Sequence, residues 1–304
     1  MPTNTTPAAP KRLLTIQDVS CVGQCSATVA LPLVSACGVE CAALPSAVLS
    51  NHTGGFPSWT FRDLTPDMAG IEAEWRKQGI LFDAFYTGYV CEPQIDPILS
   101  IMEHCAAPGA LRFVDPAMAD NGKLYVGFGA DFPSKMARLC KGADYILPNL
   151  TEAAFLLGRE PVLEGYGEAF VEETVAGLHA LGAKNVVLTG VSFDPAELGT
   201  AVSDGASIRY DFNPRLSRMA HGTGDVFASV FAGAYLRGLD ALAAAARFDH
   251  KSNVEAPELY SVVPFRLIRP GSAHARKLRL RFCRPSGLQR FRPPAAFPGR
   301  RGSG

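Results

Sequence analysis

The 304-residue chain predicts an α/β fold of three layers, in which helices cover both faces of a mostly parallel central sheet. Strand signals alternate with helical signals up to residue 248, and hydrophobic residues make up 47% of the chain, enough for a large core. No apolar run reaches the length that crosses a bilayer. The polar start Met1–Pro10 does not resemble a signal peptide, so we expect a cytoplasmic protein.

The first half of the chain contains four short apolar segments that predict strands. Between them, residues 27–36 are apolar and compatible with a helix. Residues 67–78 predict an amphipathic helix, because Met68, Ile71 and Trp75 fall on one face. The predicted strands span residues 12–16, 39–45, 83–89 and 111–116.

The alternation continues in the second half of the chain. The segments 200–202 and 207–210, separated by Asp204-Gly205, predict a β-hairpin. Helices are predicted over residues 132–140, 150–157 and 168–181, and strands over residues 144–147 and 185–189. In such folds ligands bind beyond the carboxyl ends of the strands. The candidate residues at those ends are Asp18, Tyr89, Asp115, Asn149 and Thr189.

A glycine-rich motif, His221-Gly222-Thr223-Gly224-Asp225, precedes an apolar run over residues 226–231. Small residues allow a tight turn into a helix, where unpaired N–H groups and the helix dipole favour an anion. An acid in that first turn is well placed to take a proton from a hydroxyl that attacks a phosphoryl group. The alternative is an ordinary glycine turn in which Asp225 only begins the helix.

Eight cysteines are present, and none forms a CxxC pair. Cys21/Cys25 and Cys37/Cys41 are each four residues apart, but no histidine completes a metal site at a usual spacing. We therefore expect buried, reduced thiols rather than zinc ligands.

Charge is unevenly distributed along the chain. The net charge is zero, but residues 1–248 carry −9 and residues 249–304 carry +9. Ten arginines and seven prolines in the final segment oppose helix formation and burial. We expect a disordered N-terminus over residues 1–11, one domain over residues 12–248 that lacks its last helices, and an aberrant or disordered basic tail over residues 249–304. A nucleic-acid-binding tail is the alternative, and we expect neither a nucleic-acid nor a membrane partner.

Six short motifs, in this order, resemble those of the pyridoxal kinase branch of the ribokinase-like superfamily and cover about residues 12–248. They are Leu14-Thr15-Ile16-Gln17, Ser50-Asn51-His52-Thr53-Gly54-Gly55, Thr87-Gly88-Tyr89, Val114-Asp115-Pro116, Pro148-Asn149-Leu150-Thr151-Glu152 and Gly222-Thr223-Gly224-Asp225. The resemblance implies a ribokinase-like kinase domain. It also implies ATP-dependent phosphorylation of the 5′-hydroxymethyl group of pyridoxal, pyridoxamine or pyridoxine, by a homodimer.

The resemblance implies roles for the acids and the glycine motif. Asp225 would be the base that activates the hydroxymethyl group of the substrate. The transferred phosphoryl group would lie in an anion hole formed by Gly222, Thr223 and Gly224. The carboxylates that organise Mg²⁺, partly through water, would be those of Asp115 and Glu152.

The resemblance also implies two binding sites. ATP would contact Asn149, Thr189 and Phe227. The pyridine ring and substituents of a vitamin B6 compound would contact Asp18, His52, Thr53 and Tyr89.

Structural alternatives exist for several of these residues. Asn149 and Glu152 have the spacing of a capping box and would then only begin a helix. Asp115 would be a turn residue before Pro116, and Tyr89 a core residue. His52 would be a loop histidine with one backbone hydrogen bond.

Asp18 departs from the family pattern, which has serine after Ile-Gln. A carboxylate there would pair with an ammonium on the 4-position of the ring and favour pyridoxamine; the alternative is a solvated turn acid.

Two other functions fit the sequence. One is a hydroxymethylpyrimidine kinase of the same superfamily. The other is a non-catalytic B6-binding protein, if the altered C-terminus abolishes ATP binding.

Overall fold

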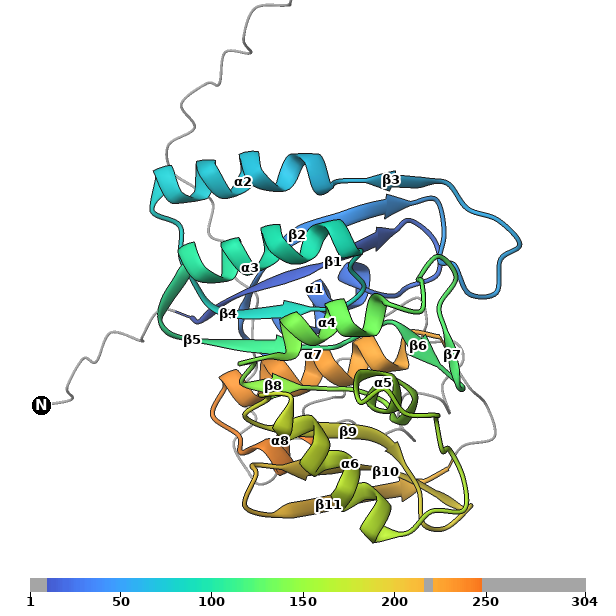
Figure 1. Cartoon of the computed structure of the whole chain (residues 1–304). Helices are drawn as coiled ribbons and strands as arrows, with labels where there is room; N and C mark the ends of the chain where they lie inside the picture. Colours follow the sequence, from blue (N-terminus) through green and yellow to red (C-terminus); the bar gives the residue numbers. More distant parts are fainter. Residues whose placement is uncertain (1–9, 216–220, 248–304) are drawn as a thin grey trace, which may run out of the picture. The chain divides into compact units, whose positions relative to one another are not determined.

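The computed structural model describes residues 10–215 and 221–247, and the statements below concern these residues (Figure 1). Nine strands form one sheet in the order β11-β10-β9-β8-β5-β4-β1-β2-β3. Their bounds are β1 (Arg12–Ser20), β2 (Glu40–Leu49), β3 (Phe61–Asp63), β4 (Phe82–Thr87), β5 (Ala106–Val114), β8 (Tyr145–Ile146), β9 (Val186–Val191), β10 (Glu197–Ser203) and β11 (Ile208–Pro214).

The strands β9, β8, β5, β4, β1 and β2 pair in parallel. The outer pairs β9–β10, β10–β11 and β2–β3 are antiparallel. The predicted hairpin of β10 and β11 is confirmed, and Asp204 closes its turn by accepting hydrogen bonds from the backbone N–H groups of Ala206 and Ser207. A second, two-stranded hairpin stands apart from the sheet and consists of β6 (Ala119–Asp120) and β7 (Lys123–Leu124).

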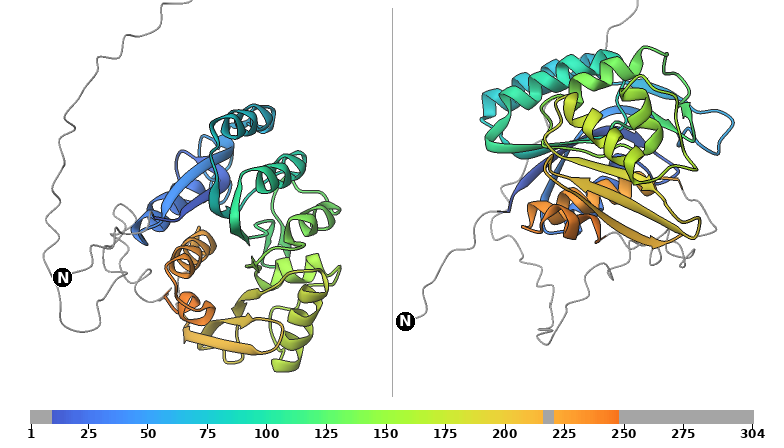
Figure 2. Two further views of the ribbon diagram at one scale, coloured as in Figure 1. Left: turned by 90° about the vertical axis from the view of Figure 1, so that its left-hand side faces the viewer. Right: turned by 60° about the horizontal axis from the view of Figure 1, so that its bottom comes forward.

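Helices cover both faces of the sheet, so the predicted three-layer architecture is confirmed (Figure 2). One apolar cluster joins the sheet to α2–α6, and the other joins its opposite face to α1, α7 and α8. The helices on the first face are α2 (Thr65–Gln78), α3 (Ile95–His104), α4 (Phe132–Cys140), α5 (Leu150–Leu156) and α6 (Glu168–Ala180). Those on the second face are α1 (Ala27–Ala36), α7 (Thr223–Leu236) and α8 (Ala241–Ala245).

Helix α7 lies close against α1 because Gly233 has no side chain. A Cβ at this position would come within 2.8 Å of the Sγ of Cys37. The close approach brings the start of α7, with its glycine motif, beside the end of β1 and the start of α1.

The sequence analysis did not predict α3, the short 3-10 helix η1 (Glu92–Gln94) before it, the edge strand β3 or the β6–β7 hairpin. Ile95, Ile98, Ile101 and Met102 give α3 a buried apolar face, but Pro93 and Pro97 at its start obscure the helical signal. The strands β3, β6 and β7 have only two or three residues each, too few for a periodic pattern.

The described cysteines are free thiols, but the prediction that they are buried is only partly correct. Cys25, Cys105 and Cys140 are buried, whereas Cys21 is exposed because it follows β1 in a loop. Cys283, most of the predicted N-terminal segment and the whole predicted tail 249–304 lie outside the described residues. Among the described residues, no helix has the length and apolar character needed to cross a membrane.

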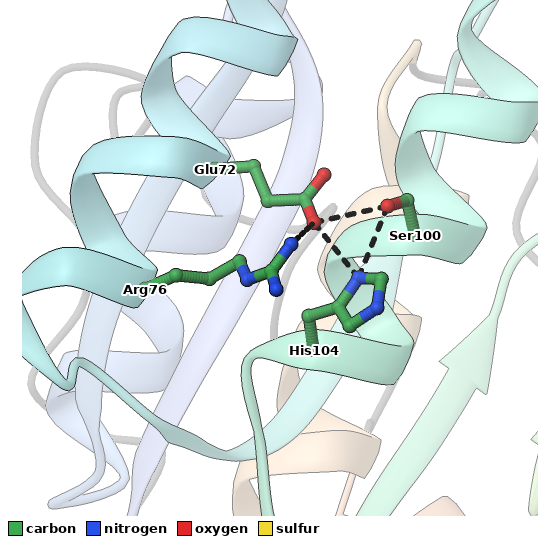
Figure 3. Close-up of polar contacts among 4 residues, drawn as sticks. All are labelled: Glu72, Arg76, Ser100 and His104. Carbon is green, nitrogen blue, oxygen red and sulfur yellow. Dashed lines mark hydrogen bonds and ion pairs between the residues drawn. The ribbon is translucent and has the colours of Figure 1, made fainter.

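Glu72 connects α2 to α3 through a buried carboxylate (Figure 3). Its Oε1 accepts a hydrogen bond from the Oγ of Ser100 at 2.9 Å and lies 2.9 Å from the Nδ1 of His104. Arg76, one turn further along α2, lies 3.8 Å from the same oxygen. The carboxylate is thus a polar link between two helices on the face opposite to α7.

We expect Glu72→Ala to lower the free energy of unfolding by about 1–2 kcal/mol, because Ser100 and His104 both lose their buried acceptor. Glu74→Ala is the matched control, since Glu74 lies on the same helix and makes exposed contacts to Lys77 and Gln78. It should change stability by less than about 0.5 kcal/mol. Urea unfolding of both variants is the measurement, and equal losses would contradict the link.

Candidate active site

The sheet order brings the predicted strand-end residues to one edge. Asp18 lies near the end of β1, Tyr89 two residues after β4, and Asp115 directly after β5. Asn149 follows β8 and pairs through an isolated bridge with Thr189 of β9. Because these five strands are consecutive in the sheet, the predicted shared edge is confirmed.

The start of α7 reaches this edge and carries the glycine motif. Gly222 is the N-cap residue and has a left-handed backbone, with φ of 78°. A Cβ at Gly222 would lie 2.8 Å from the backbone oxygen of Gln24, so glycine is required both for the turn and for the contact with the loop after β1. Thr223 and Gly224 then form the first turn of the helix. This geometry suits the predicted anion hole.

Asp225 is held in place by the loop that precedes α1. Its Oδ2 accepts a hydrogen bond from the backbone N–H of Ser26 at 2.9 Å. Ser26 adopts φ of 51°, which is unusual for a residue with a side chain, and its carbonyl oxygen accepts the first backbone hydrogen bonds of α1. Ser26 is a contact that the sequence analysis missed, because a backbone donor leaves no signal in side-chain identity.

The carboxylate of Asp225 has an altered acidity. Burial raises its pKa to about 6, the N–H of Ser26 opposes this shift, and the negative charge of Asp18 adds to it. A carboxyl group with a pKa in this range is ionised at neutral pH and still basic enough to accept a proton.

Asp115 and Glu152, the predicted metal ligands, are both buried. Burial raises the pKa of Asp115 well above its usual value, and the charge of Asp225 raises it further. Burial and the charge of Asp115 likewise raise the pKa of Glu152. The structure gives the Asp115 side chain no hydrogen bond from the described residues. A buried carboxylate without a donor, next to a second carboxylate, fits a hard divalent cation.

Glu152 also has a structural role, because it forms the predicted capping box with Asn149. The Oδ1 of Asn149 accepts a hydrogen bond from the N–H of Glu152, and the Oε2 of Glu152 accepts one from the N–H of Asn149, both at 2.9 Å. The other oxygen of Glu152 accepts from the N–H of Met118 at 3.1 Å. These bonds connect α5 to the β6–β7 hairpin. Of the two carboxylates, Asp115 is therefore the one that accepts fewer hydrogen bonds from the described residues.

The loop that contains His52 and Thr53 approaches the glycine motif from β2. The Nδ1 of His52 lies 3.2 Å from the backbone nitrogen of Gly54, so the predicted loop contact is present. The ring of His52 also lies 5.4 Å from that of His221, directly before Gly222. The pairing of these two histidines was not predicted, since it joins segments about 170 residues apart. It places the His52 loop beside the anion hole.

Asp18 lies on β1 and Tyr89 just after the neighbouring strand β4, at the same edge. The ring of Tyr89 packs 5.2 Å from that of Phe128, and its side chain is partly exposed, so Tyr89 is not a plain core residue. Asp18 is only 4% exposed, and the alternative of a solvated turn acid is therefore wrong.

Two aromatic residues complete the description of the site. Phe227 is buried in the cluster below α7, with its ring 6.3 Å from that of Phe231. A contact of Phe227 with ATP stays a prediction. Tyr125, directly after the β6–β7 hairpin, was missed by the sequence analysis. The residue is 38% exposed. Desolvation of its hydroxyl raises the pKa of Tyr125, and the charges of Glu152 and Asp115 add to the effect.

Comparison with known proteins decides the family. The family model described as phosphomethylpyrimidine kinase matches residues 33–254. This chain belongs to that family.

Structures and relatives within the family agree with the predicted branch. A phosphomethylpyrimidine kinase homologue from Bacteroides thetaiotaomicron, crystallised with pyridoxal, is 34% identical with a TM-score of 0.74 and covers 79% of this chain and 85% of its own. Pyridoxal kinase from Lactobacillus plantarum is 32% identical with a TM-score of 0.75 and covers 83% and 90%. Pyridoxal kinase PdxY of Leifsonia xyli is 31% identical over 243 residues, 74% of this chain and 81% of that protein. The prediction of a ribokinase-like fold in the pyridoxal kinase branch is confirmed.

We expect Gly222→Ala to destabilise this kinase more than Gly79→Ala, by at least about 1 kcal/mol. Both glycines have a left-handed backbone, at φ of 78° and 65°, so both variants incur the same conformational cost. Only at Gly222 does the added methyl group meet a backbone atom, the oxygen of Gln24, whereas nothing lies within 4 Å at Gly79. Urea unfolding measures the difference. Equal destabilisation of the two variants would show that the loop containing Gln24 can move away from the added methyl group without cost.

Proposed function

We propose that this protein transfers the terminal phosphoryl group of ATP to the 5′-hydroxymethyl group of a vitamin B6 compound. The observation that supports this most directly is the Asp225 carboxylate, held by the N–H of Ser26 in the first turn of α7, beside Gly222 and Gly224. A base and a set of backbone donors at one helix start provide for deprotonation of a hydroxyl and for the charge of the transferred group.

The residues divide the chemistry between them. Asp225 takes the proton from the substrate hydroxyl as the oxygen attacks phosphorus. The N–H groups at Gly222, Thr223 and Gly224 face the oxygens of the phosphoryl group in transfer. The base needs no further activation above pH 6, because its pKa of about 6 leaves it ionised.

Asp115 and Glu152 would hold Mg²⁺, and the donor set fits, as Asp115 has a buried carboxylate free of hydrogen bonds from the described residues. The metal ion would supply positive charge that offsets the charge of the ATP phosphates. Asn149 and Thr189, bridged at the ends of β8 and β9, would lie along the nucleotide, and Phe227 would contact it from α7. We place this kinase in the cytoplasm, as a homodimer.

The substrate would lie between the His52 loop and Tyr89. His52 and Thr53 approach from β2, and the partly exposed ring of Tyr89 offers a flat surface to a pyridine. A hydroxymethylpyrimidine is the second candidate substrate, because the family description names a kinase of a substituted pyrimidine. Both substrates are flat nitrogen rings with a hydroxymethyl group and would use the same base.

The test of this proposal is ATP-dependent phosphorylation of pyridoxal, pyridoxamine and pyridoxine, each assayed beside hydroxymethylpyrimidine. We expect phosphorylation of at least one B6 compound with a kcat/KM above that for the pyrimidine. The reverse order would favour the second candidate. Tight binding of a B6 compound without ADP formation would indicate a non-catalytic binding protein.

Replacing the base should lower turnover and leave the fold unchanged. We expect Asp225→Asn to reduce kcat by roughly 10²- to 10⁴-fold with little effect on substrate affinity, the usual contribution of a positioned general base. Asp211→Asn is the matched control, since burial also raises the pKa of Asp211, on strand β11 away from this edge. A kcat for Asp225→Asn close to that of the Asp211 variant would exclude Asp225 from the reaction.

The pH dependence of the reaction follows from the ionisation of the same group. Since only the ionised carboxylate accepts a proton, kcat/KM should rise with pH through about 6 and fall tenfold for each pH unit well below it. The measurement is a pH profile with saturating ATP and metal, corrected for titration of the substrate. An acidic limb near pH 4, the range of an unperturbed aspartate, would show that burial and Asp18 do not act on the base.

A further inference from the structure

Asp18 is a buried acid whose charge has no basic partner among the described residues. Its side chain lies near the end of β1 and is 4% exposed. Its Oδ2 accepts a hydrogen bond from the Oγ of Ser20 at 2.9 Å, and Ser20 is itself 2% exposed. None of the ion pairs between described residues includes Asp18. One neutral hydroxyl is a weak compensation for a carboxylate removed from water.

The neighbours of Asp18 among the described residues bring no positive charge to it. The other acids of this edge, Asp225, Asp115 and Glu152, also lack basic partners among the described residues. Burial raises the pKa of the nearby thiol of Cys25, and the charges of Asp18 and Asp225 raise it further. Buried like charges are stable only when cations offset them. A divalent cation near Asp115 and Glu152 offsets the charge at one end of the site. Asp18, on β1, lies at the other end, on the side of Tyr89.

The position of Asp18 relative to Asp225 indicates which part of a ligand it faces. The loop after β1 places Ser26 against the carboxylate of Asp225 and Cys25 against Gly222, so the end of β1 lies beside the base. In a B6 compound the group next to the reacting 5-hydroxymethyl is the 4-substituent, and the other neighbouring ring position carries only hydrogen. Of the two ring positions next to the reacting group, only the 4-position offers a polar partner to a side chain beside the base.

We propose that Asp18 binds the 4-aminomethyl group of the substrate as an ammonium ion, so that pyridoxamine is the preferred B6 compound. This inference rests on the proposed function. The aldehyde of pyridoxal and the alcohol of pyridoxine carry no charge at this position. Pyridoxamine brings a cation with hydrogen-bond donors to a buried, uncompensated carboxylate, and charge-assisted bonds of this kind are the strong ones.

The ring nitrogen is a second cationic group on these substrates, and the test separates the two. The nitrogen is common to all three B6 compounds. If Asp18 paired with it, loss of the carboxylate would weaken all three equally. If Asp18 pairs with the 4-substituent, loss of the carboxylate lowers kcat/KM for pyridoxamine alone.

The experiment compares kcat/KM for the three compounds in the wild type and in Asp18→Asn, an isosteric change that keeps an acceptor for Ser20. We expect the ratio of pyridoxamine to pyridoxine to fall about 10- to 100-fold in the variant. Glu74→Gln, which removes an exposed acid on α2, is the control and should leave the ratio unchanged. The variant removes a buried unpaired charge, so it should unfold at the same urea concentration as the wild type or a higher one.

The outcomes distinguish failure of this inference from failure of the proposed function. An unchanged ratio, or an equal loss for all three compounds, overturns the role of Asp18 while the kinase assignment stands. If no B6 compound is phosphorylated, the proposed function fails. Calorimetric affinities of pyridoxamine and pyridoxine then test Asp18 directly: a pyridoxamine preference that disappears in Asp18→Asn supports the inference, and its absence from the wild type overturns it.

Discussion

The hydrogen bond from the N–H of Ser26 to Asp225 joins two parts of the chain that are 199 positions apart, and the geometry of the site depends on it. It exists only because α7 lies against α1 and the loop after β1 lies against Gly222. Each contact requires a glycine. The missing side chain of Gly233 leaves room for Cys37, and that of Gly222 leaves room for the backbone of Gln24. The positive φ of Ser26 is part of the same constraint, since it aims the N–H at the carboxylate.

The electrostatics of the sheet edge follow from this arrangement. Buried acids meet there, and none of them has a basic partner among the described residues. Such a site is stable with cations bound and costly without them, so its chemistry favours ligands that bring positive charge. Under the proposed function, a metal ion associated with ATP and an ammonium group on the substrate would supply this positive charge. Burial, with the charge of Asp18 adding to its effect, keeps the pKa of Asp225 near 6, in the range that a general base requires.

Structural roles and proposed functional roles fall on the same residues at several positions. Asn149 and Glu152 begin α5 as a capping box, and Glu152 also receives the N–H of Met118 before the β6–β7 hairpin. A helix start is also where phosphates bind, so the two roles are compatible. His52 likewise makes the loop contact expected of a structural histidine and lies beside His221 at the glycine motif. Sequence alone left these alternatives open because both roles use the same residue types.

The sequence by itself determined the alternation of strands and helices, and hence the parallel sheet with its ligand edge. Periodicity is a local property, and α1 and α4 begin and end where the apolar patterns do. The glycine motif and Asp225 were also evident, because small residues before an apolar run are a local signal. The tertiary structure alone decided that Asp18 is buried, that Ser26 donates to Asp225 and that His52 meets His221. These contacts join distant segments, and burial or a backbone donor leaves no mark on the residue types nearby.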